Sequence, residues 1–530
     1  MFRHRGPSRS ERPLFPRASG ILLHPTCLPG PDGIGDLGPG AHRFVDWLAD
    51  HNQSVWQVLP LGPTSYGDSP YQTLSAFGGN PLLVSFERLR DEGWLVDADL
   101  AERPLLPRDH VDYGPVITWK CAMLDRAFAA FCAHGGKGPW GEFAGWCAAQ
   151  AAWLDPLALF LALKEDHEGR PWPQWAPALV AREEAALAAA RDRLAKRIDA
   201  HRFRQWLFAT QWQALRDHAR ARGVRLMGDV PIFVAYDSSD VWLQPHLFQL
   251  DAKGAPLAVA GVPPDYFSAT GQLWGNPLYD WEAARADGYR WWKDRLRACL
   301  GQVDLVRLDH FRGFDACWRV PAGALTAVDG RWMPGPGADL FAALRADFGG
   351  GALPLIAEDL GVITPAVDAL REAFDLPGMK VLQFAFSGPD NAFLPHEHAP
   401  HAVVYTGTHD NDPVLGWWDH LASVAEKAMV ADYCGAPITE PNWTLIRLGL
   451  QSCAHTFITT MPDVLGLGRE ARFNLPGADS GNWSWRLPEG AFDDPAGDRL
   501  AHLAWLYRRA PGQKAPARQE PEAPASGSFA

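Results

Sequence analysis

Three acidic residues stand at or just after short apolar segments in the second half of the chain. Asp309 closes LVRLD, Glu358 closes LIAE, and Asp410 follows VVYT. Two carboxyl groups about 5–5.5 Å apart can cleave a glycosidic bond with retention, one as nucleophile and the other as acid and then base. A third carboxylate can stabilise the positive charge of the transition state. The three residues are therefore candidates for carboxylate chemistry of this kind.

Each of these residues also has a structural interpretation. Arg307 and Asp309 share one strand face and could form a purely structural ion pair. Glu358 is either a buried acid with a raised pKa or a helix-cap partner. Asp410 could cap a helix, and Asp229, at the end of RLMGD, is either an orienting carboxylate or a structural one.

These residues need a scaffold that brings strand ends together. Near-continuous apolar runs separated by helical stretches are typical of a parallel sheet covered on both faces. Eight such runs predict a (β/α)8 barrel, whose catalytic residues lie at the carboxyl ends of the strands. The expected strands are Gly20–His24, Val55–Leu59, Arg225–Asp229, Leu305–Asp309, Leu355–Glu358, Lys380–Phe384, Val403–Thr406 and Phe457–Met461.

Two long insertions interrupt the predicted barrel of residues 19–509. Residues from about 85 to 205 are expected to form a helical subdomain, since 181–222 is dense in Ala, Leu, Arg and Glu. Residues from about 235 to 290, rich in Gly, Pro, Trp and Tyr, are expected to form a loop region that covers substrate. Residues 1–18 are predicted to be a flexible arm and 510–530 a disordered tail.

Two dipeptides predict helix starts. Thr364–Pro365 and Asp412–Pro413 each place an N-cap residue before a proline at the first helical position. A capping role gives Asp412 a structural function, so it is not expected to be catalytic. Most of the 24 Trp residues are expected in the core, and some against sugar rings.

Composition narrows the class of partner. Lys and Arg total 49 against 62 Asp and Glu, a formal charge of −13, which argues against nucleic acid. The eight Cys contain no CxxC pair, which argues against structural zinc and indicates free thiols in a reducing compartment. The Arg-rich start lacks an apolar signal region, and the most apolar segment, 145–163, is expected to be broken at Asp155–Pro156. A cytoplasmic protein without a membrane partner is expected.

At this point the motifs resemble a known family. RLDHFRG, AEDLG and YTGTHDND, in that order, are similar to the strand-end motifs of the amylomaltases, or 4-α-glucanotransferases, relatives of the α-amylases. GILLHPTCLPG, WQVLPLGPTSYGDSPYQ, GDVPIFVAYDSSDVW, PPDYFSATGQLWGNPLYDW, RFNLPG and NWSWR also resemble family segments, over roughly residues 19–490. One departure is LPHEH at Leu394–His398, where the family tends to read LPHNY.

The resemblance implies a retaining double displacement on a (β/α)8 barrel. Asp309 is implied as the nucleophile, Glu358 as the acid/base and Asp410 as the transition-state stabiliser. The implied substrate-binding residues are Ser69, Tyr71, Asp229, Asp265, Tyr266, Gln272, Trp274, Arg307, His310, His396, His409 and Asn474. No metal and no cofactor are implied.

The expected reaction transfers a segment of a 1,4-α-glucan to the 4-hydroxyl of glucose or another glucan. Maltooligosaccharides, linear glucans and glucose are the expected partners, in a monomer or homodimer. An amylase-like hydrolase with the same carboxylates is the main alternative. A metal-dependent barrel hydrolase would be expected to carry an HxH pair after the first strand, where only His24 occurs, and a non-catalytic glucan-binding protein would not need three carboxylates.

Overall fold

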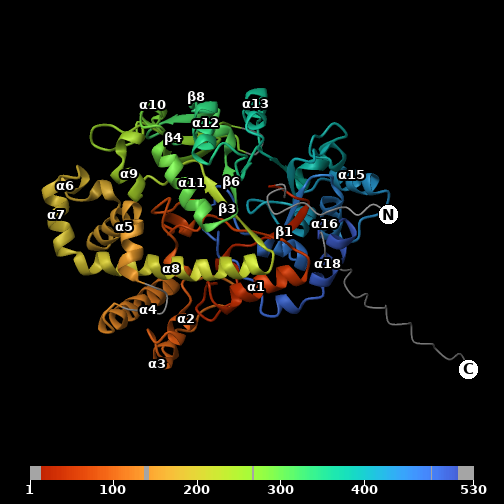
Figure 1. The fold of residues 1–530 in the computed structure, drawn as a ribbon. Coiled ribbons are helices and arrows are strands. Elements are labelled where there is room, and N and C mark those ends of the chain that lie inside the picture. The colour runs from red at the N-terminus through yellow and green to blue at the C-terminus, as the bar shows by residue number, and fades with distance from the viewer. Residues whose placement is uncertain (1–13, 137–141, 265–267, 479, 511–530) are drawn as a thin grey trace, which may run out of the picture.

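The computed structural model describes residues 14–136, 142–264, 268–478 and 480–510, and its core is a parallel sheet that closes on itself (Figure 1). Eight strands pair in the order β10-β11-β12-β1-β2-β3-β6-β9. The backbone N–H of Ala357 donates to Pro377 O at 2.9 Å and so joins β9 to the start of β10. The predicted (β/α)8 barrel is confirmed. Its strands are β1 (Ala18–Leu22), β2 (Val55–Gln57), β3 (Arg225–Pro231), β6 (Leu305–Asp309), β9 (Leu355–Ala357), β10 (Gly378–Val381), β11 (Ala402–Tyr405) and β12 (Thr456–Thr460).

Alternating residues of these strands fill the barrel. One buried cluster contains residues from all eight strands, among them Leu22, Val55, Met227, Leu305, Ile356, Met379, Val403 and Ile458. Val306 and Leu308 belong instead to the cluster between the strands and the surrounding helices. Because side chains on a strand alternate between faces, Arg307 and Asp309 follow Leu305 on the interior side.

Several strands end one to three residues before the predicted residue, and the difference is largest for β10. The apolar run Lys380–Phe384 suggests a strand throughout, but β10 stops at Val381, and 382–387 turn into a 3-10 helix. Val381 pairs with Tyr405, which is the last residue of β11. Residues after Val381 therefore have no strand residue of β11 with which to continue the hydrogen-bond ladder. The turn brings Gln383 Nε2 to Asp412 O, at 2.8 Å.

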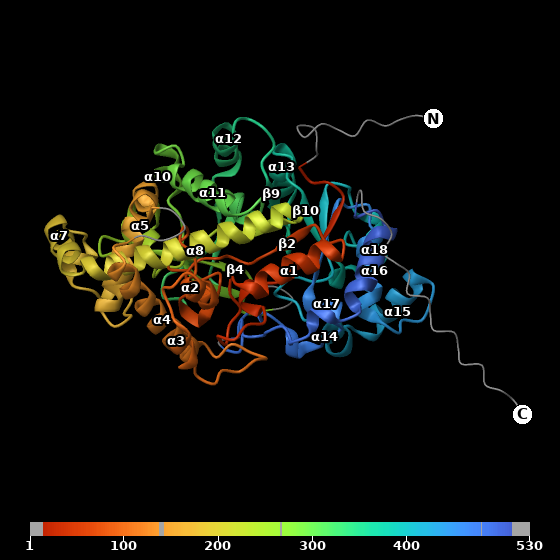
Figure 2. The same ribbon diagram turned by 60° about the horizontal axis from the view of Figure 1, so that its bottom comes forward.

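Helices surround the barrel on its outer side (Figures 1 and 2). α1 and α8 pack side by side, with α8 crossing much of the molecule. The surrounding helices are α1 (Pro39–Asp50), α8 (Ala195–Ala221), α11 (Arg290–Gln302), α12 (Gly337–Asp347), α13 (Pro365–Ala373), α14 (Val414–His420), α15 (Val424–Cys434), α16 (Pro441–Gln451), α17 (Met461–Leu465) and α18 (Ala496–Leu506).

Between β2 and β3 the chain forms a group of helices that extends to one side of the molecule (Figure 1). They are α2 (Phe86–Asp91), α3 (Asp97–Ala101), α4 (Tyr113–Ala133), α5 (Phe143–Asp166), α6 (Pro177–Val180) and α7 (Glu184–Arg193), followed by α8. The expected helical run 181–222 thus becomes two helices, α7 and α8, that meet at Leu194.

α5 corrects one expectation, because it continues through Pro156. An interior proline costs a helix about 3 kcal/mol, whereas each fully buried large apolar side chain contributes about 1.5–3 kcal/mol. Leu157, Phe160 and Leu163 are all buried where α5 packs along α8, so tertiary packing outweighs the proline. By length and composition α5 is the one described helix apolar enough to span a membrane, and 39% of its most apolar window is buried.

The region after β3 contains a second, smaller sheet. Its four antiparallel strands pair in the order β5-β4-β7-β8. They are β4 (Ala258–Val262), β5 (Gln272–Pro277), β7 (Ala316–Pro321) and β8 (Arg331–Pro334), and the short helices α9 (Ser239–Leu243) and α10 (Trp281–Ala286) flank β4 and β5 in sequence. This sheet joins the chain after β3 to the chain after β6, and β5 carries Gln272 and Trp274.

The two predicted helix starts have different outcomes. Thr364 is the N-cap of α13 with Pro365 at its first position, although the Thr364 hydroxyl makes no capping hydrogen bond. The expectation for Asp412 is wrong, because Pro413 is the N-cap residue of α14. Asp412 instead forms ion pairs with Arg469, at 2.8 Å, and Arg472. It therefore has a structural function, but not the predicted one.

Candidate active site

The three acidic residues lie at the carboxyl ends of their strands. Asp309 is the last residue of β6, Glu358 directly follows β9, and Asp410 is in the loop after β11. The side chains of Asp309 and Asp410 are 26% and 44% exposed, whereas Glu358 is buried. Two carboxylates are thus open to a ligand, and the third is shielded from water.

Arg307 organises the floor of the site. Its Nη2 lies 2.8 Å from Asp309 Oδ1, and its Nη1 lies 2.6 Å from Asp229 Oδ2. Burial alone would lower the pKa of Arg307, but Asp229 and Asp309 outweigh it and raise the pKa well above its ordinary value. Tyr71 OH donates to the same Asp229 oxygen at 2.7 Å. These contacts hold Asp309 and Tyr71 around one fixed positive charge.

Glu358 is tied to the backbone that follows Asp309. The N–H of His310 donates to Glu358 Oε2 at 2.7 Å, and the N–H of Leu360 donates to Oε1 at 2.9 Å. His310 has a left-handed backbone, with φ 53°, which turns its N–H toward β9. Burial and the neighbouring charge of Asp309 raise the pKa of Glu358 to about 8, against the opposing effect of Arg307. A carboxyl group that keeps its proton near neutral pH is suited to general acid chemistry.

Asp410 is held from the segment after β12. Asn474 Nδ2 donates to Asp410 Oδ1 at 2.6 Å, and Asn474 N donates to His409 O at 3.1 Å. Arg472 donates to the backbone carbonyl of Asp410. His409 Nε2 lies 3.3 Å from Asp410 Oδ2. The carboxylate is therefore fixed on one side by an amide and on the other by an imidazole.

Aromatic rings border the acids on two sides. Tyr71 stacks on His409, with ring centroids 5.0 Å apart and planes 17° apart, and Trp483 lies 5.8 Å from Tyr71. On the other side, the edge of one ring meets the face of the other where Trp274 contacts His310, at 4.8 Å. Burial lowers the pKa of His310 to about 4, so this imidazole is neutral near pH 7. Flat apolar faces beside neutral hydrogen-bonding groups suit a sugar ligand.

The remaining predicted residues fall into three groups. Ser69 Oγ accepts from Tyr71 N at 3.2 Å and Gln272 Oε1 accepts from Trp274 Nε1 at 3.1 Å, so each adjoins an aromatic residue of the site. His396 lies apart from this network, since its Nδ1 is 3.0 Å from Tyr433 OH and its Nε2 is 3.3 Å from Glu397. Asp265 and Tyr266 lie outside the described residues.

Sequence reasoning did not single out two aromatic residues that join the site. Trp483 approaches both Tyr71 and His409, with the latter ring at 6.0 Å. Phe233 lies within 6.5 Å of both Trp274 and His310. Both residues occur in segments that resemble the family, NWSWR and GDVPIFV, but a lone aromatic residue in a loop carries no signal of its own.

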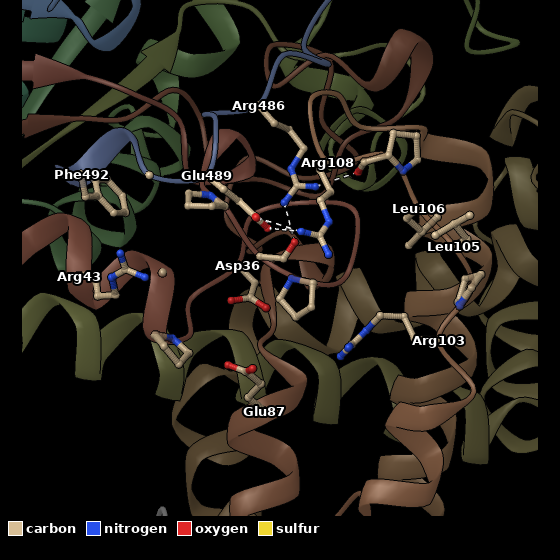
Figure 3. Close-up of a pocket in the computed structure, with 18 residues that line it drawn as sticks. Asp36, Arg43, Glu87, Arg103, Leu105, Leu106, Arg108, Arg486, Glu489 and Phe492 are labelled. Carbon is tan, nitrogen blue, oxygen red and sulfur yellow. Dashed lines mark hydrogen bonds and ion pairs between the residues drawn. The ribbon is translucent and has the colours of Figure 1, made fainter. Parts of the chain in front are cut away.

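A cavity of about 640 Å³ is lined by a different set of residues (Figure 3). It is bordered by the loop after β1, the first turns of α1 and α2, and residues 103–108 and 486–492. None of the predicted site residues lines it. Asp36 in this cavity is buried, which raises its pKa to about 6 although Lys120 opposes the shift. In the described part of the chain, no group of three or more His, Cys, Asp or Glu residues is arranged to hold a metal ion.

The fold and the site together define a class. Acidic and aromatic side chains gathered at the carboxyl ends of the strands are characteristic of (β/α)8-barrel enzymes. A family model described as 4-alpha-glucanotransferase matches residues 23–491. The chain is 50% identical over 504 residues to a 4-alpha-glucanotransferase of Thermus thermophilus, covering 93% of this chain and 99% of the relative.

A second relative and a solved structure point to the same family. A 4-alpha-glucanotransferase of Synechocystis is 49% identical over 497 residues, 93% of this chain and 98% of the relative. The structure of an amylomaltase from Streptococcus agalactiae in complex with acarbose superposes with a TM-score of 0.89 at 36% identity, covering 93% of this chain and 99% of that one. The chain belongs to the 4-alpha-glucanotransferase family, which confirms the family and enzyme class predicted from its motifs.

Proposed function

We propose that this enzyme transfers a segment of a 1,4-α-glucan to the 4-hydroxyl of glucose or another glucan by a retaining double displacement. In the first step a carboxylate oxygen of Asp309 attacks C1 of the donor sugar. The bond from C1 to the glycosidic oxygen breaks, and Glu358 gives its proton to that oxygen. The product is a glycosyl ester on Asp309 and a released glucan end.

The second step reverses the first with a new partner. The 4-hydroxyl of the acceptor attacks C1, Glu358 takes the hydroxyl proton, and the ester bond to Asp309 breaks. One glycosidic bond is exchanged for another, so the reaction needs no external energy source. Asp410 faces the positive charge that develops on the sugar ring in both steps.

One observation carries this assignment: His310 N donates to the Glu358 carboxylate at 2.7 Å. Since His310 directly follows Asp309, this bond couples the proposed nucleophile to the proposed acid. Arg307 holds Asp309 in place at 2.8 Å, while burial keeps the pKa of Glu358 near 8. The raised pKa of Glu358 suits the proton donor that the mechanism requires, and the contact with Arg307 fixes the carboxyl group proposed as nucleophile.

The remaining predicted residues receive binding roles within this proposal. Tyr71 and His409 offer a stacked aromatic surface beside Asp410 and Asp229, which suits the sugar being transferred. Trp274 and Gln272 on β5, next to His310, suit the acceptor. An acceptor held here would compete with water for the glycosyl ester. Ser69, Asn474, His396, Asp265 and Tyr266 complete the proposed binding residues.

Maltotriose as the sole substrate separates transfer from hydrolysis. Transfer releases glucose together with maltopentaose and leaves the number of reducing ends unchanged. Hydrolysis gives maltose and glucose and increases the number of reducing ends. We expect products longer than maltotriose with a nearly constant reducing-end count. A count that rises in step with glucose release, without longer products, would assign the chain to the amylase-like alternative.

We further infer a cytoplasmic setting, with linear glucans, maltooligosaccharides and glucose as partners. All eight cysteines are free, including the buried Cys27 and Cys317, which is consistent with a reducing compartment. Fractionation of cells that express the chain tests this inference. Recovery with the membrane or exported fraction would contradict it.

A further inference from the structure

The loop that carries His409 and Asp410 is anchored at both ends by one carboxylate from another element. Asp463 in α17 is buried. Its Oδ2 accepts from Thr406 Oγ1 at 2.6 Å, directly after β11, and its Oδ1 accepts from Val414 N at 2.6 Å, the first residue of α14. Thr406 and Val414 each lie four residues from Asp410, so the two oxygens hold the loop on either side of it.

We propose that Asp463 is a positioning residue for the glycosyl transfer, which acts by fixing the loop 407–413 so that Asp410 faces the sugar. This inference rests on the proposed function, because it presupposes that Asp410 stabilises the transition state. Asp463 does not touch the predicted catalytic carboxylates, and it acts only through the loop between its two partners.

The anchor is itself rigid. Asp463 N donates to Thr460 Oγ1 at 3.2 Å, which ties it to the end of β12, and Asn442 Nδ2 on α16 donates to Asp463 O at 2.9 Å. The Thr406 hydroxyl also lies 3.0 Å from Thr459 Oγ1 on the neighbouring strand. The position of Asp463 is therefore set by the barrel and by a surrounding helix, not by the loop that it holds.

A role in capping α14 does not account for both contacts. A helix cap needs only the bond to Val414 N, whereas the bond to Thr406 lies before the loop and outside any helix. Arg472 and Asn474 hold the middle of the loop through the Asp410 carbonyl and carboxylate. Asp463 thus supplies the two outer contacts of a loop whose centre is already held.

Replacement of Asp463 should change the rate of the chemical step more than substrate binding. A misplacement of about 1 Å in a catalytic group can cost about 100-fold in rate. For Asp463→Ala we expect kcat on maltotriose to fall about 100-fold, with KM within about threefold. Asp463→Asn keeps one acceptor oxygen, so a fall of about tenfold is expected. Thr406→Val removes one of the two donors without changing side-chain size, and should resemble Asp463→Asn.

Asp32→Asn is the matched control. Asp32 is also buried and accepts from two side chains, Arg103 Nε at 2.7 Å and Trp119 Nε1 at 3.1 Å, and neither of these partners belongs to the loop 407–413. We expect this variant to lose thermal stability while kcat stays within about twofold. Equal losses of kcat in the control and in Asp463→Asn would overturn the proposal, since any buried carboxylate would then have the same effect.

A double-mutant cycle with Asp410→Asn gives the decisive test. If Asp463 acts through Asp410, Asp463→Asn or Thr406→Val should cost less than about threefold in kcat once Asp410 is replaced. The same tenfold loss in both backgrounds would overturn the inference. If Asp410→Asn itself leaves kcat unchanged, the proposed function fails instead, and the two failures are therefore distinguishable. Thr406→Val is the variant to use should the Asp463 variants fold poorly.

Discussion

The protonation state of Glu358 should set the alkaline limit of the reaction. With a pKa of about 8, about nine-tenths of the free enzyme carries the proton at pH 7 and about one-tenth at pH 9. Because the first step needs this proton, kcat/KM for maltotriose should fall about tenfold per pH unit above about pH 8. If the pKa of Glu358 were not raised, this fall in kcat/KM, the alkaline limb of the pH profile, would begin below pH 5. Glucose release, measured at substrate concentrations far below KM, reports kcat/KM directly.

An activated donor provides the matched control for this pH profile. Fluoride leaves α-maltosyl fluoride without needing a proton, so fluoride release should not show the limb near pH 8. Glu358→Gln should likewise retain first-step activity on the fluoride while losing it on maltotriose. An identical alkaline limb for both donors would refute the assignment of that limb to Glu358. A limb at pH 5–6 for maltotriose would refute the raised pKa itself.

Three further outcomes follow from the same contacts. Tyr71→Phe keeps the ring stacked on His409 but removes the 2.7 Å hydrogen bond to Asp229, and kcat/KM should fall about tenfold. An unchanged kcat/KM would show that this hydrogen bond does not contribute to catalysis. Arg307→Met leaves Asp229 and Asp309 without their buried counter-charge, so urea titration should show that the free energy of unfolding falls by about 3–5 kcal/mol. An unchanged urea midpoint would contradict this expectation. Because folding raises the pKa of Glu358, the protonated side chain contributes its full stability below the unfolded pKa, and this contribution is lost as pH rises to about 8. The neutral side chain of Glu358→Gln does not titrate, so the Tm of this variant should rise relative to that of the parent across that interval. A pH-independent Tm difference would argue against this linkage.

Much of the barrel could be predicted from the sequence because each strand faces apolar surroundings on both sides. Runs such as LVRLD place Val306 and Leu308 against helices and leave the alternate positions to the interior. Charged residues at those interior positions, such as Arg307, therefore indicate the open end of the barrel. This local pattern was sufficient to locate Asp309 and Glu358 at strand ends.

Features that depend on distant partners could not be predicted in this way. Asp412 and Pro413 have the composition of a helix start, yet Asp463, about 50 residues later, accepts from the first N–H of α14. Pro156 reads locally as a helix breaker, but α8 supplies enough buried contact to keep α5 continuous. Trp483 adjoins Tyr71 only because the segment after β12 returns to the barrel mouth.

Trapping the glycosyl-enzyme is the most direct test of the mechanism. Glu358→Gln incubated with α-maltosyl fluoride should accumulate the intermediate. Fluoride leaves in the first step without an acid, whereas the second step lacks the base that takes the proton from the acceptor hydroxyl. Mass spectrometry of a peptide digest should then find two added hexose units on the peptide that contains Asp309, and Asp309→Asn should abolish the adduct. A stable adduct on another carboxylate, or continued turnover by a variant lacking Asp309, would contradict the account.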